Sequence, residues 1–312
     1  MTENLPAKKE PTVSERFTSM IVKEFSATGA ITKFSEKQRR LAQHLFVKVD
    51  SDLKALEKKR AEKNPKGAPI VWQNVNMNKL ALDAVHRIEL GLDALIPNHI
   101  STIPYFNTRE SRYDIDLRIG YVGKDYYRRE MATEKPVEII YELVHKNDLF
   151  IPKKRSLSNP IESYEFEVSK PFDRGPVIGG FGYIMYEDQR KNKLVIVTDQ
   201  DFKKSEKAAK GDSFWTLHTD EMKYKTIVNR VTSKIQIDPD KVGVSYMAVE
   251  ADEIVEPVNP EATVQAEIDA IANGDFIDIK PEAGTVQPAE MTPEEMAEIQ
   301  AQEAGAGSGP GW

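Results

Sequence analysis

Apolar residues recur every three or four positions in the segment that follows Ser35. This spacing places them on one side of a helix and predicts an amphipathic helix from residue 35 to about residue 60. Its apolar face consists of Leu41, Leu45, Val49, Leu53 and Leu56. The run NPKGAP at residues 64–69 ends this helix, because proline and glycine both interrupt helical structure. A second helix is predicted over roughly Asn78 to Leu92, whereas residues 1–34 are polar and mixed and are predicted to be poorly ordered.

The middle of the chain changes to a period of two, which is typical of strands. Residues His99–Phe106 and Tyr113–Gly120 flank the polar turn NTRESR and are predicted to form a hairpin. In the second of these segments apolar residues alternate with Asp114, Asp116 and Arg118, so one face is expected to be buried and the other exposed to solvent. A short helix that carries KDYYRRE is predicted to start near Gly123. Further strands are predicted over residues 137–145, 164–168, 177–186 and 193–197, and further helices over residues 199–210 and 216–235.

The helix predicted over residues 216–235 has three distinct sides when its residues are placed at about 100° intervals. One stripe is apolar and consists of Leu217, Tyr224, Ile227, Val228, Val231 and Ile235. A second side carries Lys223, Thr226, Arg230, Ser233 and Lys234, and a third carries Lys225, Asn229 and Thr232. We therefore expect the first side to pack and the other two to meet solvent or an anion.

The net charge of −7 is distributed unevenly along the chain. Residues 247–312 contain 15 acidic residues and one basic residue, whereas residues 1–246 contain 42 basic and 35 acidic residues. A basic body with an acidic tail is common among proteins that bind nucleic acid. The tail is rich in Ala, Glu, Pro and Gly and is predicted to be mostly disordered, with short helices possible at residues 259–274 and from Thr292. It either recruits partners, competes with nucleic acid for the basic body, or is merely a solvated segment.

Several classes of function are disfavoured by what the sequence lacks. There is no cysteine, which excludes disulfides and thiolate metal sites and fits a reducing cytoplasm. No apolar run is long enough for a membrane span, and the first twenty residues have no apolar core typical of a secretory signal. No phosphate-binding G-x-x-x-x-G-K-[ST] motif is present, and the five histidines show no metal-ligand spacing. Asp114 and Asp116 would suit a nuclease carboxylate pair, but on an alternating strand they are more often a solvent-facing row.

Three stretches of the chain resemble the phage RecT family of single-strand DNA annealing proteins. The first is Leu90-Gly91-Leu92-Asp93, followed by Ile103-Pro104-Tyr105. The second is the strand-to-helix junction LRIGYVG at residues 117–123. The third joins Phe214-Trp215-Thr216 to the segment EMKYKT at residues 221–226 and to Arg230. The sequence departs from the family pattern at Tyr224, where family members usually have a lysine.

The resemblance implies a function without covalent chemistry, so no catalytic residue, ATP or resident metal is expected and Mg²⁺ is at most an accessory ion. Annealing needs cations that hold a strand by its phosphates, with aromatic or apolar platforms beneath the bases. The candidate DNA-binding residues are Arg118, Tyr121, Lys124, Tyr127 and Arg128 at the junction, and Trp215, Lys223, Lys225, Thr226, Arg230 and Lys234 in the third stretch. Glycines at 120 and 123, with the start of a helix, would let a phosphate approach the backbone. The alternatives are solvated basic helix faces and, for Trp215, packing in the core.

The resemblance also implies an α+β fold, in which an antiparallel β-hairpin sheet packs on the long helix beside an N-terminal helical lobe. We divide the chain into an N-terminal segment with subunit contacts (residues 1–70), an annealing core (residues 71–246) and the acidic tail (residues 247–312). The implied partners are single-stranded DNA, the annealed duplex, further copies in a ring or helical filament, a 5′–3′ exonuclease and the host single-strand-binding protein. The expected location is the cytoplasm of a bacterial host.

Two other classes of function remain open. A passive single-stranded DNA-binding protein would use the same basic surface without accelerating pairing, and an assembly protein would oligomerise without a preference for DNA.

Overall fold

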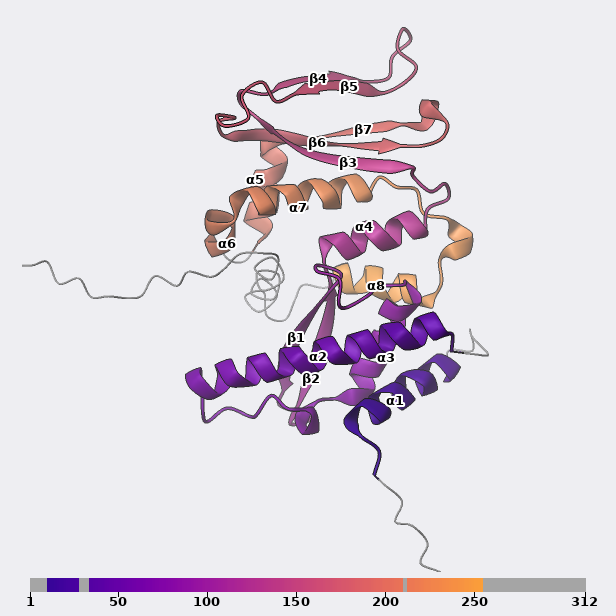
Figure 1. Ribbon diagram of the computed structural model, residues 1–312, viewed down its shortest axis with the longest axis vertical. Helices are drawn as coiled ribbons and strands as arrows, with labels where there is room; N and C mark the ends of the chain where they lie inside the picture. The colour runs from indigo at the N-terminus through magenta and orange to yellow at the C-terminus, as the bar shows by residue number, and fades with distance from the viewer. Residues whose placement is uncertain (1–9, 28–33, 210–211, 255–312) are drawn as a thin grey trace, which may run out of the picture. The chain divides into compact units, whose positions relative to one another are not determined.

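The computed structural model describes residues 10–27, 34–209 and 212–254, except for the side chains of residues 212–214, 253 and 254. All of these residues belong to one unit of the chain, residues 1–274. The fold is α+β, as predicted, and combines helices with small antiparallel sheets (Figure 1). The predicted single sheet is instead divided into three separate sheets in the described part of the chain.

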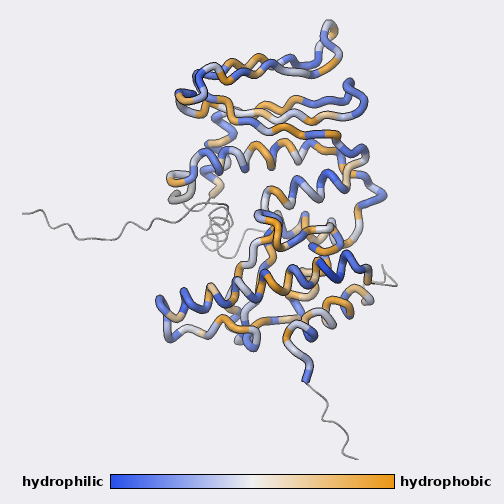
Figure 2. Tube along the Cα trace, viewed as in Figure 1, coloured by the Kyte–Doolittle hydropathy of each residue, from blue (hydrophilic) through white to orange (hydrophobic). Residues whose placement is uncertain are grey.

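Three N-terminal helices share one apolar core. They are α1 (Val13–Ala27), α2 (Glu36–Lys63) and α3 (Met77–Glu89), and the short 3₁₀ helix η1 (Trp72–Asn74) lies between the last two. Helix α2 begins with a capping box at Ser35 and alternates polar and apolar residues along its length (Figure 2). Helix α1 corrects the prediction of poor order for residues 1–34, because Phe17, Ile21 and Phe25 are spaced four residues apart and are buried against the other helices.

The predicted hairpin is confirmed and forms a two-stranded sheet of its own. It pairs β1 (Ile100–Asn107) with β2 (Arg112–Ile119) in antiparallel register, with Ile100 opposite Ile119. Its apolar face, which includes Ile115 and Leu117, is buried in the core shared with α1, α2 and α3. The following helix, α4, spans Tyr121–Glu130 and starts slightly earlier than predicted.

The second half of the chain is layered around a three-stranded antiparallel sheet. The sheet has the order β3 (Glu138–His145), β6 (Val177–Met185), β7 (Lys193–Thr198). Helix α7 (Thr219–Thr232) packs on one face, and the hairpin β4 (Leu149–Lys153) and β5 (Ser163–Glu167) lies on the other (Figure 1). A 3₁₀ turn, η2 (Gln189–Lys191), precedes β7. Strand β4 was not predicted.

Glycines in β6 allow α7 to approach the sheet closely. A Cβ atom on Gly180 would lie 2.1 Å from Ile227 Cδ1, and one on Gly182 would lie 2.2 Å from Val231 Cγ2. On the opposite face Phe181 stacks on Phe150 of β4, with ring centroids 4.6 Å apart. The sheet is therefore covered on both faces by apolar contacts.

Four more helical elements complete the described part of the chain. They are α5 (Asp199–Ala208), α6 (Asp212–Leu217), the 3₁₀ turn η3 (Pro239–Lys241) and α8 (Val244–Ile254). The helix predicted over residues 216–235 is broken at His218, whose backbone is non-helical, so α6 and α7 are separate. The change of composition after Tyr246 falls inside α8, and the first residues of the acidic tail are therefore helical. The short helices predicted at residues 259–274 and from Thr292 lie outside the described residues.

Candidate nucleic-acid interface

The junction between β2 and α4 is a tight strand-to-helix turn built around two glycines. The backbone N–H groups of Gly120 and Gly123 donate to the carbonyls of His99 and Asn98, at 3.2 and 3.1 Å. A Cβ atom on Gly120 would lie only 2.3 Å from the Asn98 carbonyl oxygen, and one on Gly123 would lie 2.7 Å from the His99 carbonyl oxygen. The expectation that these glycines leave room for a phosphate is therefore wrong, because the backbone of residues 98 and 99 fills that space.

The two predicted arginines of the junction are held by carboxylates and a carbonyl. Arg118 Nε donates to Asp116 Oδ2 at 2.7 Å, and its Nη1 donates to the backbone carbonyl of Asp252 at 3.1 Å. Arg128 Nη2 donates to Glu250 Oε1 at 2.6 Å. Residues 250 and 252 both belong to α8, so the last described helix already covers part of the predicted interface.

The other junction candidates differ in how exposed they are. Lys124 is half-buried on α4. The ring of Tyr127 has no exposed surface and lies in the core shared with α1 and α3, while its hydroxyl donates to Glu250 at 3.0 Å. In this structure Tyr127 therefore cannot stack on a base, contrary to its predicted role.

Helix α7 presents its cations toward α5 and toward solvent. Lys223 Nζ lies 5.8 Å from the centre of the Phe202 ring, and Arg230 Nη1 lies 3.3 Å from Asp201 Oδ1. Both contacts are with α5. Lys225 is half-buried, and Lys234 is exposed just beyond the end of α7.

Two candidates from the third stretch are buried. Thr226 is almost inaccessible, and its hydroxyl donates to the Met222 carbonyl at 2.9 Å within α7. It therefore supports helix packing and does not reach a phosphate in this structure. Trp215 is also buried, and its Nε1 has no hydrogen-bond partner among the described residues. Core packing, the alternative considered for Trp215, describes its position.

The two groups of candidates meet where α4 packs against α7. Tyr121, the first residue of α4, makes an edge-to-face contact with Tyr224 at a centroid distance of 6.2 Å. Burial raises the pKa of Tyr121, and the nearby Glu221 raises it further, so the phenol remains neutral at physiological pH. Tyr224, at the position where the family pattern has a lysine, also contacts Tyr141 of β3 at 6.3 Å. This aromatic contact joins the junction to α7.

A family model described as the RecT family matches residues 81–267, which extend from within α3 past the end of α8. The chain belongs to the RecT family. RecT-family proteins act in DNA recombination as single-strand annealing proteins, as the sequence resemblance indicated. A search of the curated proteins finds no match to the chain.

Sequence reasoning missed one basic residue within the RecT-family match. Arg87 lies on the buried face of α3, three residues after Ala84, and is only 2% exposed. Its Nε donates to the Leu117 carbonyl at 3.0 Å, and its Nη2 donates to Asp252 Oδ2 at 2.7 Å. An arginine within an otherwise apolar helix face was a signal that could have identified it, but its carboxylate partner lies 165 residues away.

The two aspartates on β2 have structural partners. Asp114 accepts hydrogen bonds from Asn76 at 3.0 Å and Asn107 at 3.2 Å, and Asp116 holds Arg118. Among the described residues no group of three or more His, Cys, Asp or Glu side chains could hold a metal ion. Within the same ranges no helix is long and apolar enough to cross a membrane.

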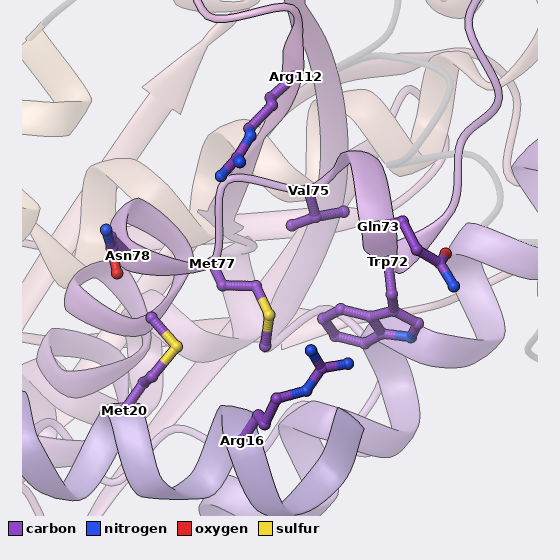
Figure 3. A pocket seen from close by; sticks show the side chains of 8 residues that line it. All are labelled: Arg16, Met20, Trp72, Gln73, Val75, Met77, Asn78 and Arg112. Carbon is purple, nitrogen blue, oxygen red and sulfur yellow. The ribbon is translucent and has the colours of Figure 1, made fainter. Parts of the chain in front are cut away.

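A cavity of about 290 Å³ lies between α1, η1, the start of α3 and β2. Arg16 and Arg112 approach it from opposite sides, and Met77 points toward the Trp72 indole (Figure 3). Its lining residues are Arg16, Met20, Trp72, Gln73, Val75, Met77, Asn78 and Arg112. None of them belongs to the predicted interface.

Proposed function

We propose that the protein binds single-stranded DNA and pairs complementary strands without ATP, in homologous recombination of the phage type. The observation that carries this proposal is the RecT-family match, which spans both α4 and α7. These helices pack against each other through Tyr121 and Tyr224, so that the cations of the two sequence stretches belong to neighbouring elements.

The proposed mechanism needs only non-covalent contacts. Lys124 on α4 and Lys223, Lys225 and Arg230 on α7 are partly exposed and hold the strand by its phosphates, with Lys234 beyond the helix end. The bases remain accessible for pairing because phosphate contacts position a strand without covering its base edges. Mg²⁺ acts at most as an accessory ion.

Assembly and partners follow from the same family assignment. The protein forms a homo-oligomeric ring or helical filament on DNA and works with a 5′–3′ exonuclease and the single-strand-binding protein of a bacterial host. The N-terminal helices supply candidate subunit contacts, since Val47 on α2 and Leu82 on α3 are 54% and 41% exposed.

The test measures pairing of two complementary, fluorescently labelled oligonucleotides without ATP. Wild type should accelerate pairing, and Lys225→Ala/Arg230→Ala should not, because both cations lie on the α7 surface. The matched control is Lys135→Ala/Arg190→Ala, which removes one exposed lysine and one exposed arginine that pair with Glu130 and Asp188. Equal loss of activity in both double variants would contradict a role for α7.

The same experiment separates annealing from passive binding. A protein that binds the labelled single strand but leaves the pairing rate at its protein-free value would be a passive single-stranded DNA-binding protein. Loss of binding as well as pairing would contradict both functions.

A further inference from the structure

Helix α8 is held on the body of the protein by polar contacts and, among its described residues, by two apolar side chains. Ser245 bonds to His86 Nδ1 at 2.9 Å and to the Glu89 carboxylate, both on α3. Two described side chains of α8 make apolar contacts: Val249 is fully buried, and Tyr246 packs against the same core with its ring centroid 6.2 Å from that of Tyr127. Val244 and Met247 are 62% and 57% exposed. Helix α8 therefore buries less apolar surface than α1, whose Phe17, Ile21 and Phe25 are all buried, and it can leave its site more readily.

The acidic residues of α8 converge on three arginines from three different elements. These are Arg87 of α3, Arg118 of β2 and Arg128 of α4, which we call the arginine site. Asp252 contacts Arg87 through its carboxylate and Arg118 through its backbone carbonyl, while Glu250 contacts Arg128. The arginines belong to the body of the fold, and two of their partners lie on the last described helix.

Helix α8 does not satisfy the arginine site completely. Arg87 is 98% buried by its neighbours, yet its Nη1 has no hydrogen-bond partner among the described residues, and Asp252 engages only Nη2. A guanidinium pairs best with a group that offers two acceptor oxygens in one plane, such as a carboxylate or a phosphate held by both nitrogens. The unused donor therefore points to a ligand with more available oxygens than α8 presents.

We propose that the arginine site binds phosphates of single-stranded DNA, and that α8 occupies this site through Glu250 and Asp252 when DNA is absent. The inference rests on the proposed function, which supplies the polyanion. Arg118 remains partly neutralised by Asp116 on its own strand. Replacement of α8 by DNA phosphates therefore adds more ion pairing at Arg87 and Arg128 than at Arg118. DNA and α8 then compete, and the apparent affinity for DNA is reduced by the fraction of molecules in which α8 is docked.

The first test removes the two competing charges from the full-length protein. Glu250→Gln/Asp252→Asn should bind a fluorescein-labelled oligothymidine about three- to tenfold more tightly than wild type in an anisotropy titration. The matched control is Glu187→Gln/Asp173→Asn, which neutralises two exposed carboxylates on the sheet half of the molecule. An equal gain in the control would mean a general charge effect and would overturn the inference.

The second test keeps every charge of the arginine site and fixes α8 in place. The chain has no cysteine, so the thiols of Glu89→Cys/Ser245→Cys are the only two in the variant, and they lie where α8 meets α3. A short bis-methanethiosulfonate crosslinker should weaken oligothymidine binding severalfold, and dithiothreitol should restore it. The same variant treated with methyl methanethiosulfonate controls for modification without crosslinking.

The outcomes separate this inference from the proposed function. If wild type binds the oligothymidine and the crosslink leaves binding by Glu89→Cys/Ser245→Cys unchanged, the role of α8 is overturned and the proposed function stands. If neither wild type nor any variant bound the oligothymidine, the proposed function itself would fall, and the inference with it.

Discussion

The arginine site and the α5–α7 surface are two basic regions that hold their charges in different ways. In the arginine site, Arg87 and Arg128 have side chains only 2% and 14% exposed, and their partners lie on α8. On the α5–α7 surface, Lys203 and Arg230 are 65% and 40% exposed and pair with Asp199 and Asp201 on α5. The first region is closed by a segment distant in sequence, and the second remains open to solvent.

The difference shows that basic residues of equal charge are not equally available to DNA. Exposed ion pairs contribute little and exchange readily for phosphate contacts, because water and salt screen them. Buried guanidiniums need a partner at all times, because an unpaired buried charge is costly. We therefore expect the α5–α7 surface to make the first contact with DNA and the arginine site to follow when α8 leaves.

The largest expected effect is on stability, at Arg87. Arg87→Ala should lower the free energy of unfolding by about 3–4 kcal/mol, because it removes a buried side chain and its hydrogen bonds to Leu117 and Asp252. Lys234→Ala removes the same charge from an exposed position and should change it by less than about 0.5 kcal/mol. Urea unfolding of the two variants measures the contrast. Similar costs for both would mean that the two regions do not differ in the way described.

The next prediction concerns pH and contrasts two aspartates. Asp83 lies on α3 near Arg87 of the arginine site, and Asp201 lies on the α5–α7 surface. Burial raises the pKa of Asp83 to about 6 in spite of the nearby Arg87, with Asp252 and Asp116 adding to the shift. A folded-state pKa above the unfolded value means that protonation stabilises the fold below about pH 4, and that this stabilisation is lost as the pH rises through about 6. Asp83→Asn should therefore gain about 2 kcal/mol relative to wild type between pH 4 and pH 7, after allowance for partial solvent screening.

Asp201 on the α5–α7 surface should behave in the opposite way. The backbone hydrogen bond from Thr198 lowers the pKa of Asp201, and Arg230 lowers it further. Its stabilising contribution is present at neutral pH and is lost as the pH falls through the lowered pKa, so Asp201→Asn should lose stability relative to wild type at pH 7. Urea unfolding across this pH range checks both variants. A gain of stability in both, or a loss in both, would contradict the opposite pKa shifts of Asp83 and Asp201.

A smaller effect is expected on the salt dependence of DNA binding. Lys223→Ala/Arg230→Ala should reduce the slope of log affinity against log salt by roughly 1.4, or about 0.7 for each lost phosphate contact on a single strand. The control Lys135→Ala/Arg190→Ala should leave the slope unchanged. Anisotropy titrations at several salt concentrations give both slopes. An unchanged slope in the α7 variant would place the phosphate contacts elsewhere.

The smallest effect separates the tail from α8. Removal of residues 255–312 leaves Glu250 and Asp252 in place and should change oligothymidine affinity by less than about threefold, since salt screens charges that are not paired directly with the arginine site. Removal of residues 244–312 also removes α8 and should tighten binding further, provided that thermal unfolding shows a folded protein. If the shorter deletion had the larger effect, the competing charges would lie beyond α8.

Local periodicity was sufficient for much of the fold and failed where partners are remote or irregular. The apolar spacing of α2 and α3 and the alternation in β2 predicted those elements, because their buried faces repeat at the helix or strand period. Strand β4 was missed because Pro152 interrupts a short segment whose pairing with β5 supplies its structure. The break between α6 and α7 was missed because Leu217 fits the apolar period of α7, although it ends α6 and is 76% exposed, and the non-helical backbone of His218 leaves no trace in that period.

The candidate interface was predictable only in part, for a related reason. The sequence identified the strand-to-helix junction and the cationic sides of α7, but it could not show which residues are covered. Tyr127 sits on the same helix as Arg128 yet points into the core, and Thr226 bonds back to its own helix. Composition placed Glu250 in a mostly disordered acidic tail, whereas it lies on α8 and binds an arginine 122 residues earlier in the chain.

The most direct test of the account is the rate at which full-length protein pairs two complementary dye-labelled oligonucleotides without ATP. One strand is bound to the protein first, and the naked complement is then added with an excess of unlabelled non-complementary strand. The account predicts that pairing is faster than in the absence of protein and that the non-complementary strand does not abolish the gain. Pairing at or below the protein-free rate, with the first strand fully bound, would contradict annealing and leave a protein that only coats single strands.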